Sequence, residues 1–164
     1  MPDVVYGVMT LHPTHLIRNP DPTRTVNFNM PNECNLCHLE KSVNWSIAEY
    51  RRLWNKDSQS GDSTFDEPEI VRGFAAGDAV YRAVLLDRAK KSDLKGFEDV
   101  YGAGLDDPFY IVNTFATDAL ETRYHQRFPL PSDWRAFLAT QNITSHNLER
   151  LKSTATDEAF EFGE

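Results

Sequence analysis

The segment Cys34-Asn35-Leu36-Cys37-His38 holds both cysteines of this 164-residue chain and a histidine within five positions. Two thiols three positions apart can add to the two vinyl groups of one haem, while the imidazole that follows reaches its iron. The pattern predicts one covalently attached haem c, with Cys34 and Cys37 as the thioether residues and His38 as an axial ligand. No other short motif in the chain implies so specific a chemistry.

The same cysteine pair has three other readings: a local disulfide, a thioredoxin-type redox site or part of a zinc site. A redox pair is expected near a strand–helix–strand pattern, and no apolar β run precedes the motif. A structural zinc normally takes four ligands, so without a second cysteine pair it would recruit His38 with His12 or His15. Haem attachment is the prediction, and a disulfide or zinc staple is the alternative.

Composition limits the class of protein and its partners. A chain of this length with 40% hydrophobic residues can form one compact domain with its own core. The net charge of −8 and pI near 5.1 argue against nucleic acid or an anionic membrane surface as a partner and favour basic or neutral ones. No run of 18 or more apolar residues is present, so no membrane span is expected.

The expected location follows from the haem prediction. Haem c attachment takes place outside the cytoplasm, yet residues 1–20 lack the basic start and apolar run of a secretion signal. We therefore expect a periplasmic or extracellular protein in which Met1 is a mature or shortened start.

Residues 1–33 contain four prolines after Pro2 and no sustained periodicity, which predicts an extended, irregular arm. Such an arm cannot bury itself and needs a surface to lie against, and a porphyrin face would serve. The expected haem contacts in the arm are Leu16, Ile17, Phe28 and Met30. Trp45, just after the motif, is expected either at the porphyrin edge or in the aromatic core.

From Leu39 onward, apolar residues recur at helical spacing and no strand alternation is evident, which predicts an all-α fold. Asp78, Ser132 and Ser145 are expected helix N-caps. The predicted organisation is a haem-binding arm and helix over 1–55 and a helical region over 65–164, within one compact unit. The expected helices are 40–55, 66–76, 78–89, 94–105, 108–124, 133–140 and 145–158.

Two helical segments, 77–83 and 106–112, echo each other with an Asp before an apolar run. A period near 30 residues suits antiparallel helix pairs of the HEAT type. The acidic residues Asp62, Asp66, Glu67 and Glu69 are expected to form a solvated face rather than a calcium site, because they lack the spacing of a calcium loop.

Together, segments 16–22, 30–45, 76–83 and 105–108 resemble the C-terminal portion of multihaem c-type cytochromes that end in HEAT-like helices. The likeness runs from about His15 to Arg123, but this chain has one Cys-x-x-Cys-His and not several. The family has a distal haem ligand directly before its proline-rich arm, and His15 matches that place. His12 is the close alternative, and Met9 and Met30 are the sulfur alternatives.

The resemblance implies a bis-histidine haem that carries electrons and is not a catalyst, because the iron has no open position. Its implied partner is a redox protein, either another cytochrome or a multihaem assembly. Two other functions stay open from the sequence. One is a helical-repeat interaction module with a disulfide or zinc staple, and the other is a haem sensor or enzyme whose distal ligand leaves the iron.

Overall fold

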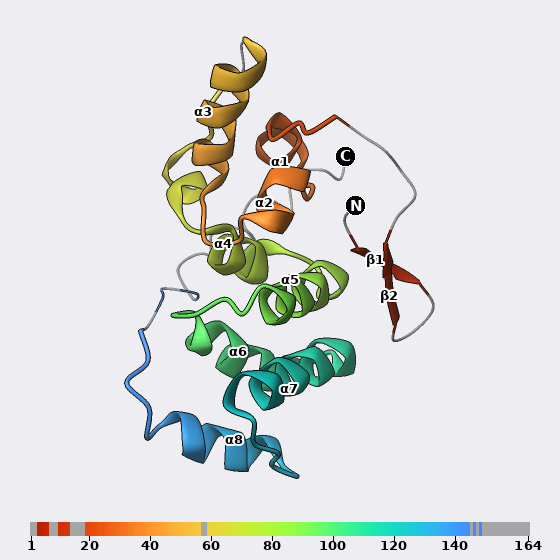
Figure 1. Cartoon of the computed structure of the whole chain (residues 1–164), viewed down its shortest axis with the longest axis vertical. Helices are drawn as coiled ribbons and strands as arrows, with labels where there is room; N and C mark the ends of the chain where they lie inside the picture. The colour runs from red at the N-terminus through yellow and green to blue at the C-terminus, as the bar shows by residue number, and fades with distance from the viewer. Residues whose placement is uncertain are drawn as a thin grey trace, which may run out of the picture.

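The computed structural model describes residues 19–56 and 59–144 with His146 and Leu148, and the backbone of 3–6 and 10–13. Within these ranges the fold is all-α, as predicted, with one short β-hairpin added at the N-terminus (Figure 1). The elements are β1 Asp3–Tyr6, β2 Thr10–Pro13, α1 Thr23–Phe28, α2 Glu33–Cys37, α3 Val43–Trp54, η1 Ser63–Asp66, α4 Glu69–Ala76, α5 Ala79–Lys91, α6 Glu98–Leu105, α7 Tyr110–Tyr124 and α8 Pro131–Leu138.

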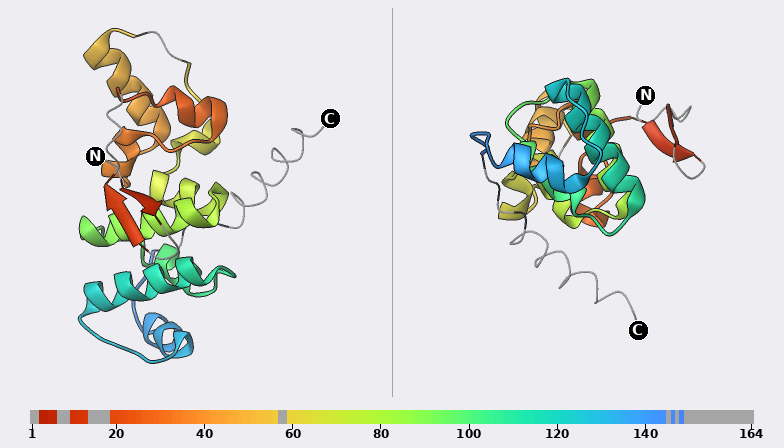
Figure 2. Two further views of the ribbon diagram at one scale, coloured as in Figure 1. Left: turned by 90° about the vertical axis from the view of Figure 1, so that its right-hand side faces the viewer. Right: turned by 90° about the horizontal axis from the view of Figure 1, so that it is seen from below.

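Helices α4 to α8 form a stack, with α1, α2 and α3 at one end and α8 at the other (Figure 1). Helix α4 packs on α5, α5 packs on α7, and α6 contacts both α7 and α8. Figure 2 shows α5 and α7 side by side from a second direction. This arrangement fits the expected antiparallel HEAT-like pairs, with α4 and α5 as one pair and α6 and α7 as the next.

One apolar core runs through the stack and reaches the cysteine motif. Leu85 of α5, Leu120 of α7 and Trp134 of α8 are fully buried in it. Leu36 and Leu39, on either side of Cys37 and His38, belong to the same core. Each buried side chain of this size contributes about 1.5–3 kcal/mol, so the motif is fixed to the stack by its apolar neighbours.

Side chains cap the starts of α3 and α5, and of these two caps only Asp78 was predicted. The Ser42 hydroxyl accepts from the Trp45 amide at 3.0 Å, so α3 begins at Val43 and not at the expected residue 40. Asp78 accepts from the Tyr81 amide at 2.7 Å and begins α5.

Helix α8 begins differently from the prediction. Pro131 is its first residue and Leu130 occupies the N-cap, so Ser132 is not the cap. Proline suits this position because its fixed φ matches the helix and it needs no amide partner. The predicted cap Ser145 and most of the helix expected after it lie outside the described residues.

The N-terminal arm is more regular than its prolines suggest. Strands β1 and β2 pair antiparallel, with Val4 opposite His12. Helix α1 follows Asp21, whose carboxylate accepts from the amide and hydroxyl of Thr23. It ends at Asn29, which adopts the left-handed conformation with φ 48°.

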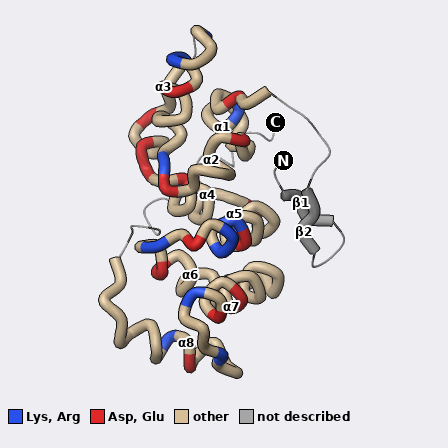
Figure 3. Tube along the Cα trace, viewed as in Figure 1, with Lys and Arg blue, Asp and Glu red and all other residues tan. Residues whose placement is uncertain are grey.

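The polar loop between α3 and α4 is tied to α3. The side-chain nitrogen of Asn44 donates to the Asp66 carboxylate at 2.8 Å, and the side-chain oxygen of Asn44 accepts from the Gly61 backbone amide at 2.8 Å. Figure 3 shows acidic positions gathered beside α3 on this side of the molecule. Asp62 and Asp66 are exposed there, as expected for a solvated face.

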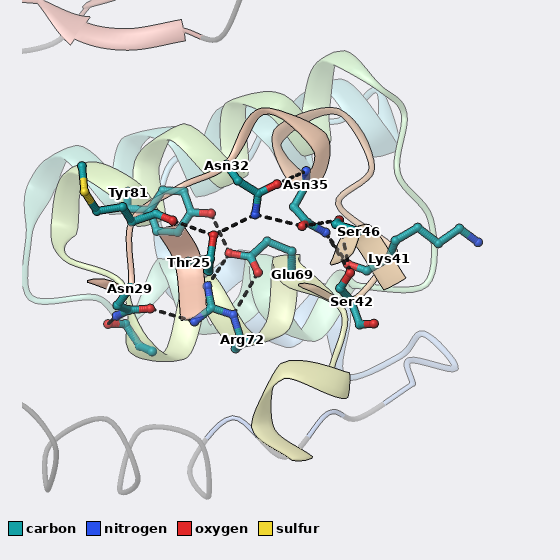
Figure 4. A network of polar contacts seen from close by, with 12 residues as sticks. Thr25, Asn29, Asn32, Asn35, Lys41, Ser42, Ser46, Glu69, Arg72 and Tyr81 are labelled. Atoms are coloured by element: carbon teal, nitrogen blue, oxygen red, sulfur yellow. Dashed lines mark hydrogen bonds and ion pairs between the residues drawn. The ribbon is translucent and has the colours of Figure 1, made fainter. Parts of the chain in front are cut away.

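Glu69 corrects the predicted acidic face, because it is fully buried and not solvated. It accepts from the Arg72 guanidinium at 2.7 and 2.9 Å and from the Tyr81 hydroxyl at 2.6 Å. Arg72 also donates to Asn29 at 2.8 Å, so the network reaches the segment before the motif (Figure 4). The charge is tolerated because each partner is hydrogen-bonded.

Replacing Glu69 with Gln is expected to lower the free energy of unfolding by about 3–5 kcal/mol, because it leaves the buried Arg72 charge without a counter-ion. Urea denaturation followed by circular dichroism measures the loss. The matched control is Glu49→Gln, which breaks an i,i+3 pair with Arg52 on the surface of α3 and should change stability little. Equal losses in the two variants would contradict the account.

Stability should fall above about pH 10. Burial raises the pKa of Tyr81 well above its usual value, and nearby Glu69 raises it further. Burial also raises the pKa of Tyr101. The folded state therefore keeps protons that the unfolded chain loses, so this contribution is complete below pH 10 and disappears as pH rises.

Urea denaturation from pH 8 to 11 tests this. Tyr81→Phe should flatten the decline of unfolding free energy with pH, whereas Tyr110→Phe, at a residue 75% exposed, should not. A decline of the same steepness in both variants would contradict the assignment.

Candidate functional site

The predicted attachment motif forms helix α2 and its C-cap. Asn32 begins the helix, and its side chain accepts from the Asn35 amide at 3.0 Å. His38 ends it, with its amide donating to the Cys34 carbonyl at 2.9 Å. Cys34 and Cys37 are therefore one helical turn apart, and both carry free thiols.

A buried polar network lies beneath this turn (Figure 4). Asn35, between the two cysteines, is fully buried, and its oxygen accepts from Ser46 at 2.6 Å and Asn32 at 3.0 Å. Asn32 also donates to the Thr25 hydroxyl at 2.7 Å, which in turn donates to the Met30 carbonyl at 2.7 Å. The network joins α1, α2 and α3 at one point.

The backbone just after the motif connects this network to α4. The Asn35 side-chain amide donates to the carbonyls of Lys41 and Ser42 at 3.0 and 3.2 Å. The Lys41 carbonyl also accepts from the Glu69 amide at 3.0 Å, and the Leu39 carbonyl accepts from Ile70 at 3.0 Å. These carbonyls satisfy amides at the start of α4, where Pro68 offers no side-chain cap. Motif and stack therefore share one hydrogen-bond system.

The reactive groups of the motif lie toward solvent while their spacers are buried. Cys37 is exposed, Cys34 is half-buried, and the His38 side chain is 55% exposed. Burial, with a smaller contribution from Glu33, raises the pKa of the Cys34 thiol. A neutral thiol is a poor redox nucleophile, which disfavours the thioredoxin-type alternative.

Aromatic and acidic side chains flank His38. Its ring meets Trp45 edge-on, with ring centroids 5.2 Å apart. Its Nδ1 lies 4.0 Å from the Glu40 carboxylate, which is too long for a hydrogen bond. The Lys41 ammonium group lies over the Trp45 ring, 5.9 Å from its centroid. Trp45 therefore lies half-buried beside the predicted iron ligand.

An arginine from the stack reaches the end of the motif. Arg88 of α5 donates from Nε to the Leu36 carbonyl at 3.1 Å and from Nη2 to Cys37 Sγ at 3.5 Å. The second distance suits a weak bond to sulfur. Fifty-one positions separate Arg88 from Cys37, so no local pattern could have paired them.

The remaining predicted contacts divide into two groups. Phe28 and Met30 are 70% and 41% exposed in the segment from α1 to α2, apolar surface that leads into the motif. His12 lies in β2, where the backbone alone is described. His15, Leu16 and Ile17 lie outside the described residues.

Sequence reasoning missed three residues that hold the motif in place. Asn35 appeared only as a spacer, although asparagine is unusual at a fully buried position and is tolerated only with all its hydrogen bonds made. Asn32, three residues before it, carried a usable signal as a preferred helix N-cap. Arg88 carried none, because its role depends on how α5 packs.

Searches of protein-family models, curated proteins and solved structures find no match to this chain. Among the described residues, no helix is long and apolar enough to cross a membrane. Nor do three or more His, Cys, Asp or Glu side chains come together as a metal site in that part of the chain.

Replacing Asn35 with Asp should lower the free energy of unfolding by about 3 kcal/mol, because the buried donor facing two carbonyls becomes an acceptor. Urea denaturation of the apo chain measures the effect. Asn142→Asp makes the same change at an exposed position and should leave the midpoint nearly unchanged. If Asn35→Asp were as stable as the control, the network would not support the motif.

Proposed function

We propose that this chain is a c-type cytochrome subunit or domain that transfers electrons through one covalently attached haem. The observation that carries the proposal is the folded motif itself. Two free thiols and an imidazole are displayed on one helical turn, and the residues between them are locked into a buried network.

The side chains present fit such a group. Each thiol would add its sulfur and proton across one vinyl group, and both cysteines hold the free thiol that this addition consumes. Cys37, His38, Phe28 and Met30 are exposed and offer ligating and apolar atoms to such a group. The group when bound supplies reversible one-electron chemistry at its iron.

His38 would hold one axial position of the iron, and its neighbours bear on its orientation. Contact with Trp45 restricts the ring, and burial of Leu39 fixes the backbone next to it. Glu40 could accept from Nδ1 after a small movement, the usual outer-shell partner for a ligating histidine.

The second axial ligand is His15 in this proposal, with His12 as its alternative. His15 follows from the family resemblance, whereas His12 is the alternative because only two residues separate it from His15. Strand β1, paired with the strand that holds His12, contacts α5, the helix whose Arg88 reaches Cys37. Two imidazoles would close the iron to substrate, which favours an electron carrier over a catalyst.

A carrier with one haem must exchange electrons with another redox protein, here proposed to be another cytochrome or a multihaem assembly. The net charge of −8 favours a basic docking surface on that partner and disfavours nucleic acid. Haem attachment places the proposed site of action in the periplasm or outside the cell.

Visible spectroscopy tests the proposal on protein produced with a periplasmic haem-maturation system. We expect a Soret band that survives acid-acetone extraction and sharp low-spin bands on reduction. His15→Ala and His12→Ala separate the two distal candidates, because only loss of the true ligand converts the iron from six-coordinate low-spin. Carbon monoxide binding by the reduced wild type would contradict a closed iron and favour a sensor.

The matched control is the double variant Cys34→Ser, Cys37→Ser, which keeps His38 and should retain no colour after extraction. A colourless wild-type protein would contradict the proposal. If that protein held zinc or a Cys34–Cys37 disulfide, the chain would be a helical interaction module with a staple.

A further inference from the structure

Among the described residues of the helical stack, Arg88 alone donates a hydrogen bond to a cysteine of the motif. It lies half-buried in the last turn of α5, between the fully buried residues Leu86 and Ala89. The two lysines of the same turn pair with carboxylates, Lys91 with Asp87 at 2.7 Å and Lys90 with Asp118.

Two hydrogen bonds of the guanidinium hold it at the end of α2. Its Nε donates to the Leu36 carbonyl, one of the last carbonyls of the helix and without an intrahelical partner. Its planar fork then sets Nη2 toward Cys37 Sγ. The first bond does not involve sulfur, so the guanidinium keeps its place when the thiol becomes a thioether.

We infer that Arg88 is a positioning residue that docks the attachment motif on α5 and raises the reduction potential of the haem through its charge beside Cys37. This inference rests on the proposed haem function.

Electrostatics sets the direction in which Arg88 changes the reduction potential. A thioether sulfur is bonded to a substituent of the porphyrin, so a guanidinium at Cys37 Sγ is a positive charge at the edge of the redox group. The oxidised centre carries one more positive charge than the reduced centre. A nearby cation therefore destabilises the oxidised form and favours uptake of the electron. Half-burial of Arg88 limits screening by water and salt.

Spectroelectrochemical titration of Arg88→Gln, Arg88→Lys and Arg127→Gln holoproteins tests the inference. Arg127→Gln is the matched control, because it removes the same charge from a side chain that is 85% exposed. Arg127 follows α7, a helix that lies on the far side of α5 from α2 (Figure 1). We expect Arg88→Gln to shift the midpoint potential to a lower value. Arg88→Lys should bring the potential most of the way back to the wild-type value, and Arg127→Gln should leave the potential unchanged.

The docking role has its own readout in the apo chain. Arg88→Gln should accelerate hydrogen exchange at the amide of His38, which is bonded within α2, more than Arg127→Gln does. A structural effect alone would speed this exchange in both Arg88 variants and lower the potential in both. The charge account requires the lysine variant to recover the potential.

Four outcomes overturn the inference. A red Arg88→Gln protein with the wild-type potential refutes the electrostatic role, and so does an Arg88→Lys protein whose potential is as low as that of Arg88→Gln. Equal shifts in Arg88→Gln and Arg127→Gln refute its location. A colourless wild type refutes the proposed function and the inference together, so the two failures are distinguishable.

Discussion

The side chain of Asn35 is the contact on which the site depends. It occupies a spacer position between the two cysteines, yet it is fully buried and uses its oxygen and amide for four hydrogen bonds. A buried amide in a low-dielectric interior is favourable only when all these bonds form, which selects one conformation of α2. Cys37 and His38 therefore face solvent, while the backbone between the cysteines is held by the buried hydrogen bonds of Asn35.

A second polar centre connects the motif to the helical stack. Glu69, Arg72 and Tyr81 form a buried set, and the backbone amide of Glu69 shares the Lys41 carbonyl with Asn35. The two centres therefore meet at one carbonyl, which accepts a hydrogen bond from each. Networks of this kind specify a unique arrangement at the cost of tolerance to substitution.

Local chemistry made part of this fold predictable. The cap at Asp78 located α5 because a short polar side chain before an apolar helical pattern is a local signal. Ser42 carries the same signal at the start of α3 and was not used. The prolines of the arm led to a prediction of irregular structure, so the hairpin and α1 were missed. The hairpin is stabilised by strand pairing and α1 by Asp21. Burial of Glu69 and the reach of Arg88 depend on packing between distant segments, which no pattern within the chain reports. The motif was evident from five residues, whereas its support was not.

Intact-mass spectrometry under denaturing conditions tests the central claim most directly. Protein from cells with periplasmic haem maturation should gain the mass of one haem, and the gain should remain after unfolding because two thioether bonds hold it. The Cys34→Ser, Cys37→Ser variant should show the mass of the polypeptide alone. A wild-type mass equal to that of the bare chain would contradict the assignment of this motif as a haem attachment site.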